Sequence, residues 1–125
     1  ELGNISTTRD LTNVKDLCEG FHEIYKSDSL LGEVTNIGMN SEISIGDLAI
    51  LISNLMETDL NIETSNERVR PKNSEVERLV CDNTRLTNNT SWKPKYTLKD
   101  GISEVIEWMK KPENLSMYKA GRYNV

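Results

Sequence analysis

Residues 8–21 read TRDLTNVKDLCEGF, and apolar side chains recur in and after this stretch with helical spacing. They lie three, four, seven and eleven positions after the first of them, which places them in one stripe along a helix. The spacing therefore predicts an amphipathic helix over residues 14–26. The residues of the stripe are Val14, Leu17, Cys18, Phe21 and Tyr25.

Two further segments combine a helix start signal with the same periodicity. Ser44 precedes an apolar pattern over residues 45–55, and Thr97 precedes another over residues 98–109 that ends before Pro112. In each case an Asp stands three residues after the Ser or Thr, as in a capping box. Both segments are therefore predicted to be amphipathic helices.

The remaining segments predict only a few strands. Residues 32–38 are short, β-branched and bounded by glycines, and residues 60–64 are similar in length, so both are interpreted as strands. Residues 68–81 are predicted to form a loop, after which Asp82 or Asn83 can cap a short helix. So few strands cannot form a large sheet, and we expect them to join a sheet whose remainder is not in this sequence.

Composition limits the function. The 125 residues carry a net charge of -5, with 20 acidic and 15 basic side chains, which argues against broad nucleic-acid binding. The longest apolar run, at residues 48–52, is too short to cross a membrane. Cys18 and Cys81 lack CxxC spacing and indicate a reducing cytoplasm. Because the sequence opens ELGNISTTRD without Met, we expect that an N-terminal portion precedes it.

The sequence lacks the local motifs of common catalytic and cofactor sites. Two distant cysteines and a single His22 do not supply a zinc ligand set. There is no G-x-S-x-G, no P-loop and no G-x-G-x-x-G motif. His22 follows Phe21 on the predicted helix and is interpreted as a solvent-facing or packing residue. These motif absences indicate a binding rather than a catalytic role for this chain.

Charged residues concentrate in the stretch RVRPKNSEVERLVCDNTRL, residues 68–86. Such a cluster can be a solvated surface, or a site where cations meet an anion and carboxylates meet hydroxyl groups. The solvated interpretation is favoured for Arg68, Lys72, Arg78 and Arg85, with Arg78 pairing with Glu75 or Glu77.

Four residues outside this cluster are interpreted as structural. Asp10 and Asp16 are predicted to orient a turn and a helix start through local backbone hydrogen bonds. Trp92 and Trp108 are predicted to be core or interface anchors.

Several segments, in this order, resemble the C-terminal part of the extended short-chain dehydrogenase/reductases that act on nucleotide sugars. They are TRDLTNVKDLCEGF at 8–21, GEVTNIGMNSEISIGDLAILI at 32–52, RVRPKNSEVERLVCDNTRL at 68–86 and SWKPKYTLKDGISEVIEWM at 91–109. With the closing YNV, the last two segments most resemble the bacterial 4,6-dehydratases of nucleotide-linked N-acetylglucosamine.

The resemblance implies an α/β fold, helix-rich with a few short strands, in which residues 1–125 form the C-terminal, substrate-binding part of a Rossmann-type enzyme. Residues of about 13–57 would be edge elements of the Rossmann domain, whose N-terminal part holds NAD and a Tyr-x-x-x-Lys catalytic pair. Neither that pair nor a glycine fingerprint occurs in this sequence. The chain alone is therefore predicted to be inactive and not to bind NAD.

The resemblance also implies substrate-binding residues. Arg9 matches an arginine that typically reaches the diphosphate of the substrate, and Arg70 matches one that does so from the other side. Glu75 matches an acidic position that commonly accepts hydrogen bonds from the ribose hydroxyls of the nucleotide. The sequence departs from the family pattern at Asn13, where an aromatic residue is common, and in the length of the loop before Glu75.

The function implied for the full-length protein is an NAD-dependent nucleotide-sugar 4,6-dehydratase of bacterial sugar biosynthesis, acting as a homodimer. Its partner would be a nucleotide-diphosphate sugar, with no nucleic acid or membrane involved. Two alternatives stay open: a 4-epimerase of the same family, and a non-catalytic nucleotide-binding or interaction domain. The catalytic residues that would separate dehydratase from epimerase are not in this sequence.

Overall fold

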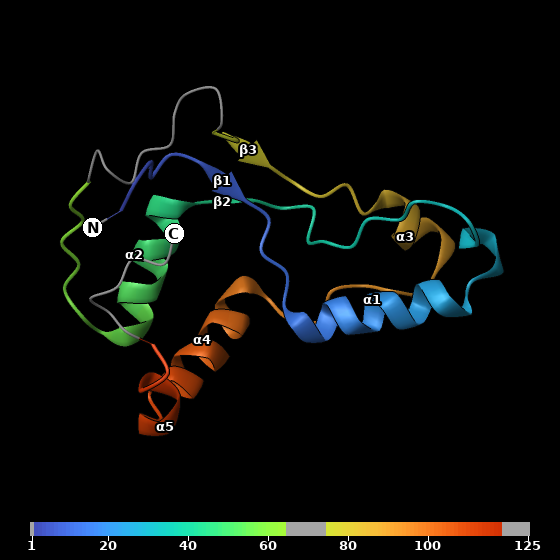
Figure 1. Ribbon diagram of the computed structural model, residues 1–125. Coiled ribbons are helices and arrows are strands. Elements are labelled where there is room, and N and C mark those ends of the chain that lie inside the picture. The colour runs from blue at the N-terminus through green and yellow to red at the C-terminus, as the bar shows by residue number, and fades with distance from the viewer. Residues whose placement is uncertain (1, 65–74, 119–125) are drawn as a thin grey trace.

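The computed structural model describes residues 2–64 and 75–118 of the chain. The elements in chain order are β1 (Thr8–Arg9), α1 (Val14–Lys26), the 3₁₀ turn η1 (Asp28–Leu30), β2 (Ile43–Ser44), α2 (Ile45–Met56), β3 (Arg78–Leu79), α3 (Thr84–Asn89), α4 (Leu98–Met109) and α5 (Pro112–Leu115). Figure 1 shows α2, α4 and α5 toward one end of the molecule, and α1 and α3 toward the other. No helix within these two ranges is long and apolar enough to cross a membrane.

A small sheet joins three distant parts of the chain in the order β2-β1-β3. β1 pairs antiparallel with β2, so that Thr8 lies opposite Ser44. β1 pairs parallel with β3, so that Thr8 lies opposite Arg78. The parallel pair is held by hydrogen bonds from Thr8 N to the Glu77 carbonyl (2.9 Å) and from Asp10 N to the Leu79 carbonyl (3.0 Å).

The three amphipathic helices predicted from the sequence are confirmed. The side chain of Asn13 caps α1 by accepting a hydrogen bond from Lys15 N at 2.8 Å. Ser44 caps α2 through Asp47 N. Thr97 begins α4 with a complete capping box. These caps satisfy backbone N–H groups that a first helical turn leaves without partners, so each helix begins where its sequence signal predicts.

The strand predictions are less successful. Residues 32–38 contain no strand; instead, side chains bind this backbone, since Asn83 Nδ2 donates to the Gly38 carbonyl at 2.7 Å. Residues 60–64 contribute only an isolated bridge between Thr64 and Leu2. Conversely, β3 lies within the predicted loop 68–81. A strand of two residues is too short to show an alternating pattern, so its partner alone determines it.

The hydrophobic core cluster consists of Leu30, Leu86 of α3 and Trp92, with Ile24 of α1 and Ile37 packed against it. The indole Nε1 of Trp92 donates to the backbone carbonyl of Asp16 at 3.0 Å, which anchors the ring to α1. The core role predicted for Trp92 is therefore confirmed. Trp108 is 41% exposed and packs edge-to-face on Tyr118, with the ring centroids 6.2 Å apart.

Much of the apolar stripe of α1 is exposed. Val14 is 67% exposed, Phe21 61% and Tyr25 88%, and Cys18 is also exposed. A contiguous apolar face of this kind is uncommon on a monomeric protein. The periodicity therefore identifies the helix correctly, but the described residues do not bury most of its apolar face.

Candidate functional site

Two of the three predicted substrate-binding residues lie together where the central strand β1 pairs with β3. Arg9 belongs to β1, and Glu75 lies three residues before β3. The parallel pairing of β1 with β3 brings them together, with Arg9 Nη2 3.5 Å from Glu75 Oε1. Their side chains are 26% and 15% exposed, so both are accessible but largely covered. Arg70, the third predicted residue, lies outside the described residues, as do Arg68 and Lys72.

The guanidinium group of Arg9 also binds backbone. Its Nη1 donates to the carbonyl of Val76 at 2.8 Å and to the carbonyl of Thr8 at 2.6 Å. The first bond joins β1 to the segment that carries Glu75. Arg9 is therefore a polar connection between two strands as well as a positive charge beside a carboxylate.

A second ionic cluster involves the neighbouring positions of the same strands. Arg78 Nε donates to both carboxylate oxygens of Glu42, at 2.7 and 2.9 Å, and the Thr8 hydroxyl donates to Glu42 as well. The predicted partner of Arg78 was Glu75 or Glu77, and that prediction is wrong. Parallel pairing places Arg78 beside Thr8, and successive strand residues point to opposite faces, so Arg78 is directed away from Arg9.

The charge on Glu42 is stabilised by its partners. The Thr8 hydroxyl, and after it the Arg78 guanidinium, lower the pKa of the Glu42 carboxyl below its usual value. Arg78 nevertheless stays 71% exposed, and exposed ion pairs contribute little to stability. Arg85 makes a similar surface contact, to Glu33 at 2.7 Å. The surface role predicted for Arg78 and Arg85 is therefore confirmed.

Asp10 connects three segments next to Arg9. Its carboxylate oxygens accept from Met39 N at 3.0 Å and from Cys81 N at 3.1 Å. A structural role was predicted for Asp10, and this is confirmed. The predicted local turn is wrong, because the partners come from distant parts of the chain. A carboxylate that accepts from two backbone amides fixes the path of both segments.

Gly38→Ala is expected to destabilise the protein by roughly 1–3 kcal/mol, the usual cost of overpacking. A methyl group at Gly38 would overlap the Cβ and Sγ of Cys81 and approach Asp10. A change of side-chain rotamer cannot move the Cβ of Cys81 away from the added methyl group, because the backbone fixes the position of Cβ. Gly101→Ala in α4 is the matched control, because its added methyl group meets only Asn13 Nδ2, at 3.4 Å. Urea denaturation checks this; equal midpoints for the Gly38 variant and the parent would contradict it.

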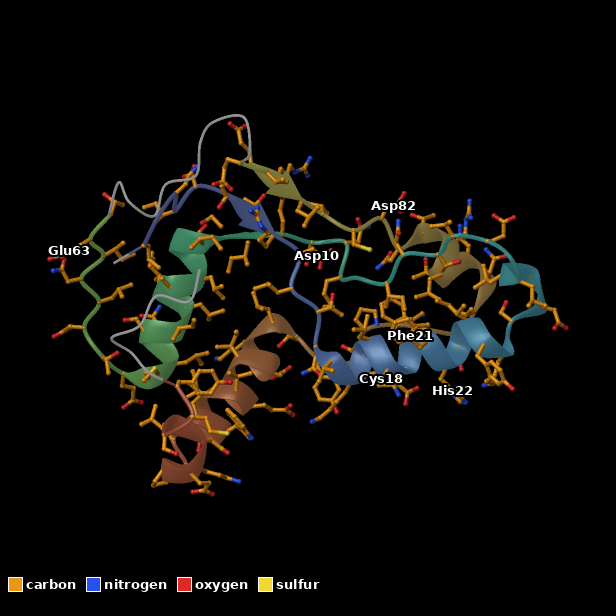
Figure 2. The ribbon with its side chains drawn as sticks, viewed as in Figure 1. Asp10, Cys18, Phe21, His22, Glu63 and Asp82 are labelled. Atoms are coloured by element: carbon orange, nitrogen blue, oxygen red, sulfur yellow. The ribbon has the colours of Figure 1, made fainter. Side chains whose placement is uncertain are left out.

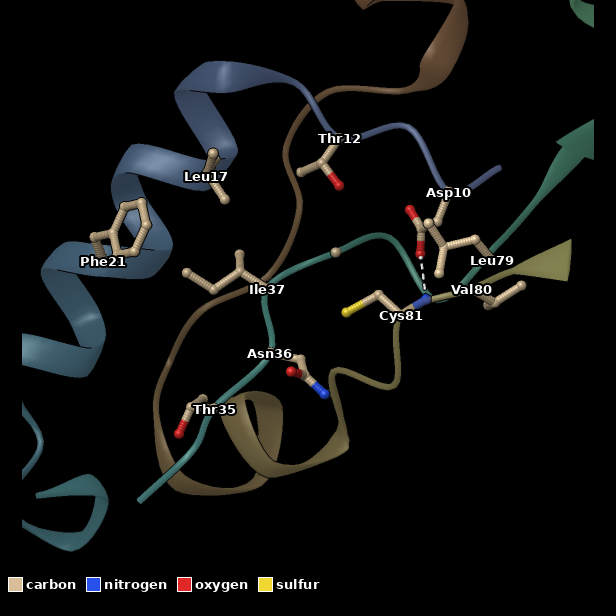
Figure 3. Close-up of a pocket in the computed structure, with 11 residues that line it drawn as sticks. Asp10, Thr12, Leu17, Phe21, Thr35, Asn36, Ile37, Leu79, Val80 and Cys81 are labelled. Atoms are coloured by element: carbon tan, nitrogen blue, oxygen red, sulfur yellow. Dashed lines mark hydrogen bonds between the residues drawn. The ribbon is translucent and has the colours of Figure 1, made fainter. Parts of the chain in front are cut away.

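A cavity of about 550 Å³ lies between α1 and the segments 35–38 and 79–81. Figure 3 shows Leu17 and Phe21 on one side of it and Cys81 on the other. Burial, followed by the charges of Asp10 and Asp82, raises the pKa of the Cys81 thiol, so this thiol stays protonated and is a poor nucleophile. Arg9 and Glu75 do not line this cavity.

Metal chemistry finds no support in the part of the chain that the structure describes. No group of three or more His, Cys, Asp or Glu side chains there could hold a metal ion. His22 is exposed on α1, and Figure 2 shows it beside Cys18, away from Asp10. The solvent-facing position predicted for His22 is confirmed.

The chain matches a family model over most of its length. Residues 1–105 match the model described as GDP-mannose 4,6 dehydratase. The chain belongs to this family. The resemblance to the extended short-chain dehydrogenase/reductases of nucleotide-sugar metabolism is thereby confirmed, and the expected fold class, helix-rich with a few short strands, agrees with the observed elements.

Individual members of the family carry several different activities. The chain is 31% identical over 115 residues to the human dTDP-D-glucose 4,6-dehydratase, covering 90% of the chain and 32% of the relative. It is 28% identical over 109 residues to a GDP-6-deoxy-D-mannose reductase of Pseudomonas aeruginosa, covering 86% of the chain and 35% of the relative. The chain thus spans about a third of the length of the curated relatives it matches.

A solved family structure has the same fold over the shared region. It is the dTDP-glucose 4,6-dehydratase of Bacillus anthracis in complex with NAD, with a TM-score of 0.69 and 25% identity. The match covers 90% of this chain and 34% of that enzyme. A dehydratase and a reductase therefore resemble this chain to similar degrees, and the shared region does not by itself identify the reaction.

The sequence did not reveal two parts of this site. The carbonyl of Val76 carries no side-chain signal, so its bond to Arg9 follows only from the strand register. Glu42 precedes β2 and gave no sign that it meets Arg78. The signal that could have identified Glu42 is its place immediately before the strand that pairs with β1.

Proposed function

We propose that this chain is the C-terminal, nucleotide-sugar-binding part of an NAD-dependent nucleotide-sugar 4,6-dehydratase. The observation that carries the proposal is the contact of Arg9 with Glu75, where β1 pairs with β3, in a member of this family. Arg70 and Arg9 supply positive charge to the diphosphate, and Glu75 accepts hydrogen bonds from the ribose hydroxyls. A guanidinium group matches phosphate oxygens in pairs, and a carboxylate suits a vicinal diol.

The division of the protein belongs to the same proposal. Residues of about 13–57 contribute edge elements to a Rossmann domain, most of which would come from chain outside residues 1–125. That domain would bind NAD, as the Bacillus anthracis relative does. This sequence has no G-x-G-x-x-G motif and no Tyr-x-x-x-Lys pair, so its own residues do not fit the cofactor. Their task is to bind and orient the nucleotide end of the substrate.

In the proposed reaction, the sugar would be oxidised at C4, lose water across C5 and C6 and be reduced at C6. NAD, held by the domain outside residues 1–125, would supply the hydride chemistry, whereas Arg9, Arg70 and Glu75 would hold the nucleotide. The proposed substrate is a nucleotide-linked N-acetylglucosamine, and the proposed assembly is a cytoplasmic homodimer. Two free cysteines, Cys18 and Cys81, are in keeping with a reducing compartment.

A 4-epimerase is the second candidate, because residues that bind the nucleotide serve either reaction. A non-catalytic nucleotide-binding domain is the third. The three candidates differ in the reaction at the sugar. In this proposal the described residues bind the nucleotide and do not contact the sugar. Product chemistry separates all three.

We expect the complete protein, incubated with NAD and a nucleotide-linked N-acetylglucosamine, to form a 4-keto-6-deoxy product that is lighter by one water. Mass spectrometry and NMR of the product measure this. An isomer of unchanged mass would favour the 4-epimerase. An unaltered sugar that still binds would favour the non-catalytic domain, and the 125-residue chain alone serves as an inactive control.

A further inference from the structure

We propose that Arg9 is a positioning residue for Glu75, so that the ribose-dependent part of nucleotide affinity requires Arg9 as well as Glu75. This inference rests on the proposed function. In the proposed function, Arg9 supplies positive charge to the diphosphate. The inference gives Arg9 a second role, which acts through the segment at residues 75–76. The two roles have different ligand dependence and can therefore be measured separately.

The geometry places Arg9 where it can hold this segment. The ladder between β1 and β3 begins with Thr8 N donating to the Glu77 carbonyl. Arg9 Nη1 donates to the carbonyl of Val76, one residue earlier, and Arg9 Nη2 lies 3.5 Å from the Glu75 carboxylate. The side chain of Arg9 thus extends the strand pairing by two residues beyond the backbone ladder.

The segment depends on this contact because it lies at the start of the pairing. Val76 is 50% exposed, whereas the Glu75 side chain is only 15% exposed. A hydrogen bond from a charged donor is stronger than one from a neutral donor. Removing the fork of Arg9 would release the Val76 carbonyl and leave the Glu75 carboxylate without its cation. The carboxylate would then lose the fixed position from which it accepts hydroxyl groups.

Arg9→Lys separates the two roles. A lysine keeps the positive charge available to the diphosphate, but it cannot reproduce the two bonds of the fork to the Val76 and Thr8 carbonyls together with the contact to Glu75. Arg78→Lys is the matched control. It makes the same substitution at the same pair of strands, in an exposed ion pair with Glu42 that is directed away from Arg9.

The experiment measures, by calorimetry on the complete protein, the affinity for a nucleoside diphosphate and for its counterpart without ribose hydroxyls. UDP, GDP and dTDP are screened first, and the pair is built on the one that binds most tightly. In the parent we expect the hydroxyl-bearing ligand to bind about tenfold more tightly or better, the order expected for hydrogen bonds to a charged group. Glu75→Ala and Arg9→Lys are each expected to lose most of this ratio, while Arg78→Lys keeps it.

Each outcome has a distinct meaning. An equal loss of affinity for both ligands in Arg9→Lys would overturn the inference and leave Arg9 as a phosphate ligand only. The inference would also be overturned if Arg9→Lys kept the full preference of the parent for the ligand with ribose hydroxyls. Arg9→Ala provides a second test. If the diphosphate still binds to this variant, the ligands with and without ribose hydroxyls should bind with nearly equal affinity. A parent that binds none of the three diphosphates would overturn the proposed function itself.

Discussion

Arg70→Ala in the complete protein is expected to weaken binding of the nucleoside diphosphate by roughly 1.5–3 kcal/mol, about ten- to a hundredfold in Kd. The reason is the loss of a guanidinium group that donates paired hydrogen bonds to a diphosphate. Calorimetric titration with the nucleoside diphosphate alone measures this, because the sugar is not needed to engage the guanidinium group.

Three further variants define the site. Arg70→Lys is expected to recover only part of the affinity, because a point charge does not reproduce the fork. Glu75→Gln should cost less than Arg70→Ala, because an amide oxygen can still accept from a ribose hydroxyl. Arg78→Ala should change affinity little, because Arg78 pairs with Glu42 on the exposed surface. Normal affinity in Arg70→Ala together with a loss in Arg78→Ala would show that the site is misplaced.

Asp16→Ala is expected to lower the free energy of unfolding by roughly 2–5 kcal/mol. Asp16 is 1% exposed, and its two carboxylate oxygens accept from Lys95 N at 2.9 Å and from Tyr96 N at 3.1 Å. Alanine would leave both backbone N–H groups without this partner in a partly buried setting, at about 1–3 kcal/mol each. It would also leave a space beside the bond that joins Trp92 to α1.

Denaturation followed by tryptophan fluorescence checks this prediction, because Trp92 reports on the same region. Glu19→Ala is the matched control: Glu19 is an exposed carboxylate of the same helix, 3.8 Å from Lys95 Nζ, and should change stability little. Equal unfolding midpoints for the two variants would mean that the buried carboxylate contributes no more than a surface charge.

The helices could be predicted because their signals are local. Apolar periodicity located α1, and periodicity together with a capping side chain located α2 and α4. The boundaries differ by at most one residue from those predicted. α5 was missed, since its four residues, Pro112–Leu115, are too few to show a period. Helix formation depends on neighbouring residues, which a single sequence displays directly.

The sheet and the buried carboxylates could not be predicted in the same way. β1, β2 and β3 have two residues each, and each is defined by a partner far away in the chain. Asp16 illustrates the same limit: a local helix-start role was predicted, but its side chain binds Lys95 N and Tyr96 N. Long-range partners depend on the fold as a whole and leave no periodic signal.

The candidate site lies between these two cases. Arg9 and Glu75 were assigned through the family resemblance, and the parallel register of β1 with β3 then brings them within 3.5 Å. Nothing in the residues alone indicated that Arg9 would bind the carbonyl of Val76. The proposed positioning role of Arg9 is therefore argued from the structure, whereas the proposed role of Arg70 rests on the family resemblance alone.

The most direct test of the central proposal is calorimetric titration of the complete protein with UDP, GDP and dTDP in the absence of any sugar. We expect at least one of the three to bind, and Glu75→Gln to weaken that binding while Arg78→Ala does not. Failure of all three diphosphates to bind would contradict the assignment of this chain as the nucleotide-binding part of a nucleotide-sugar enzyme.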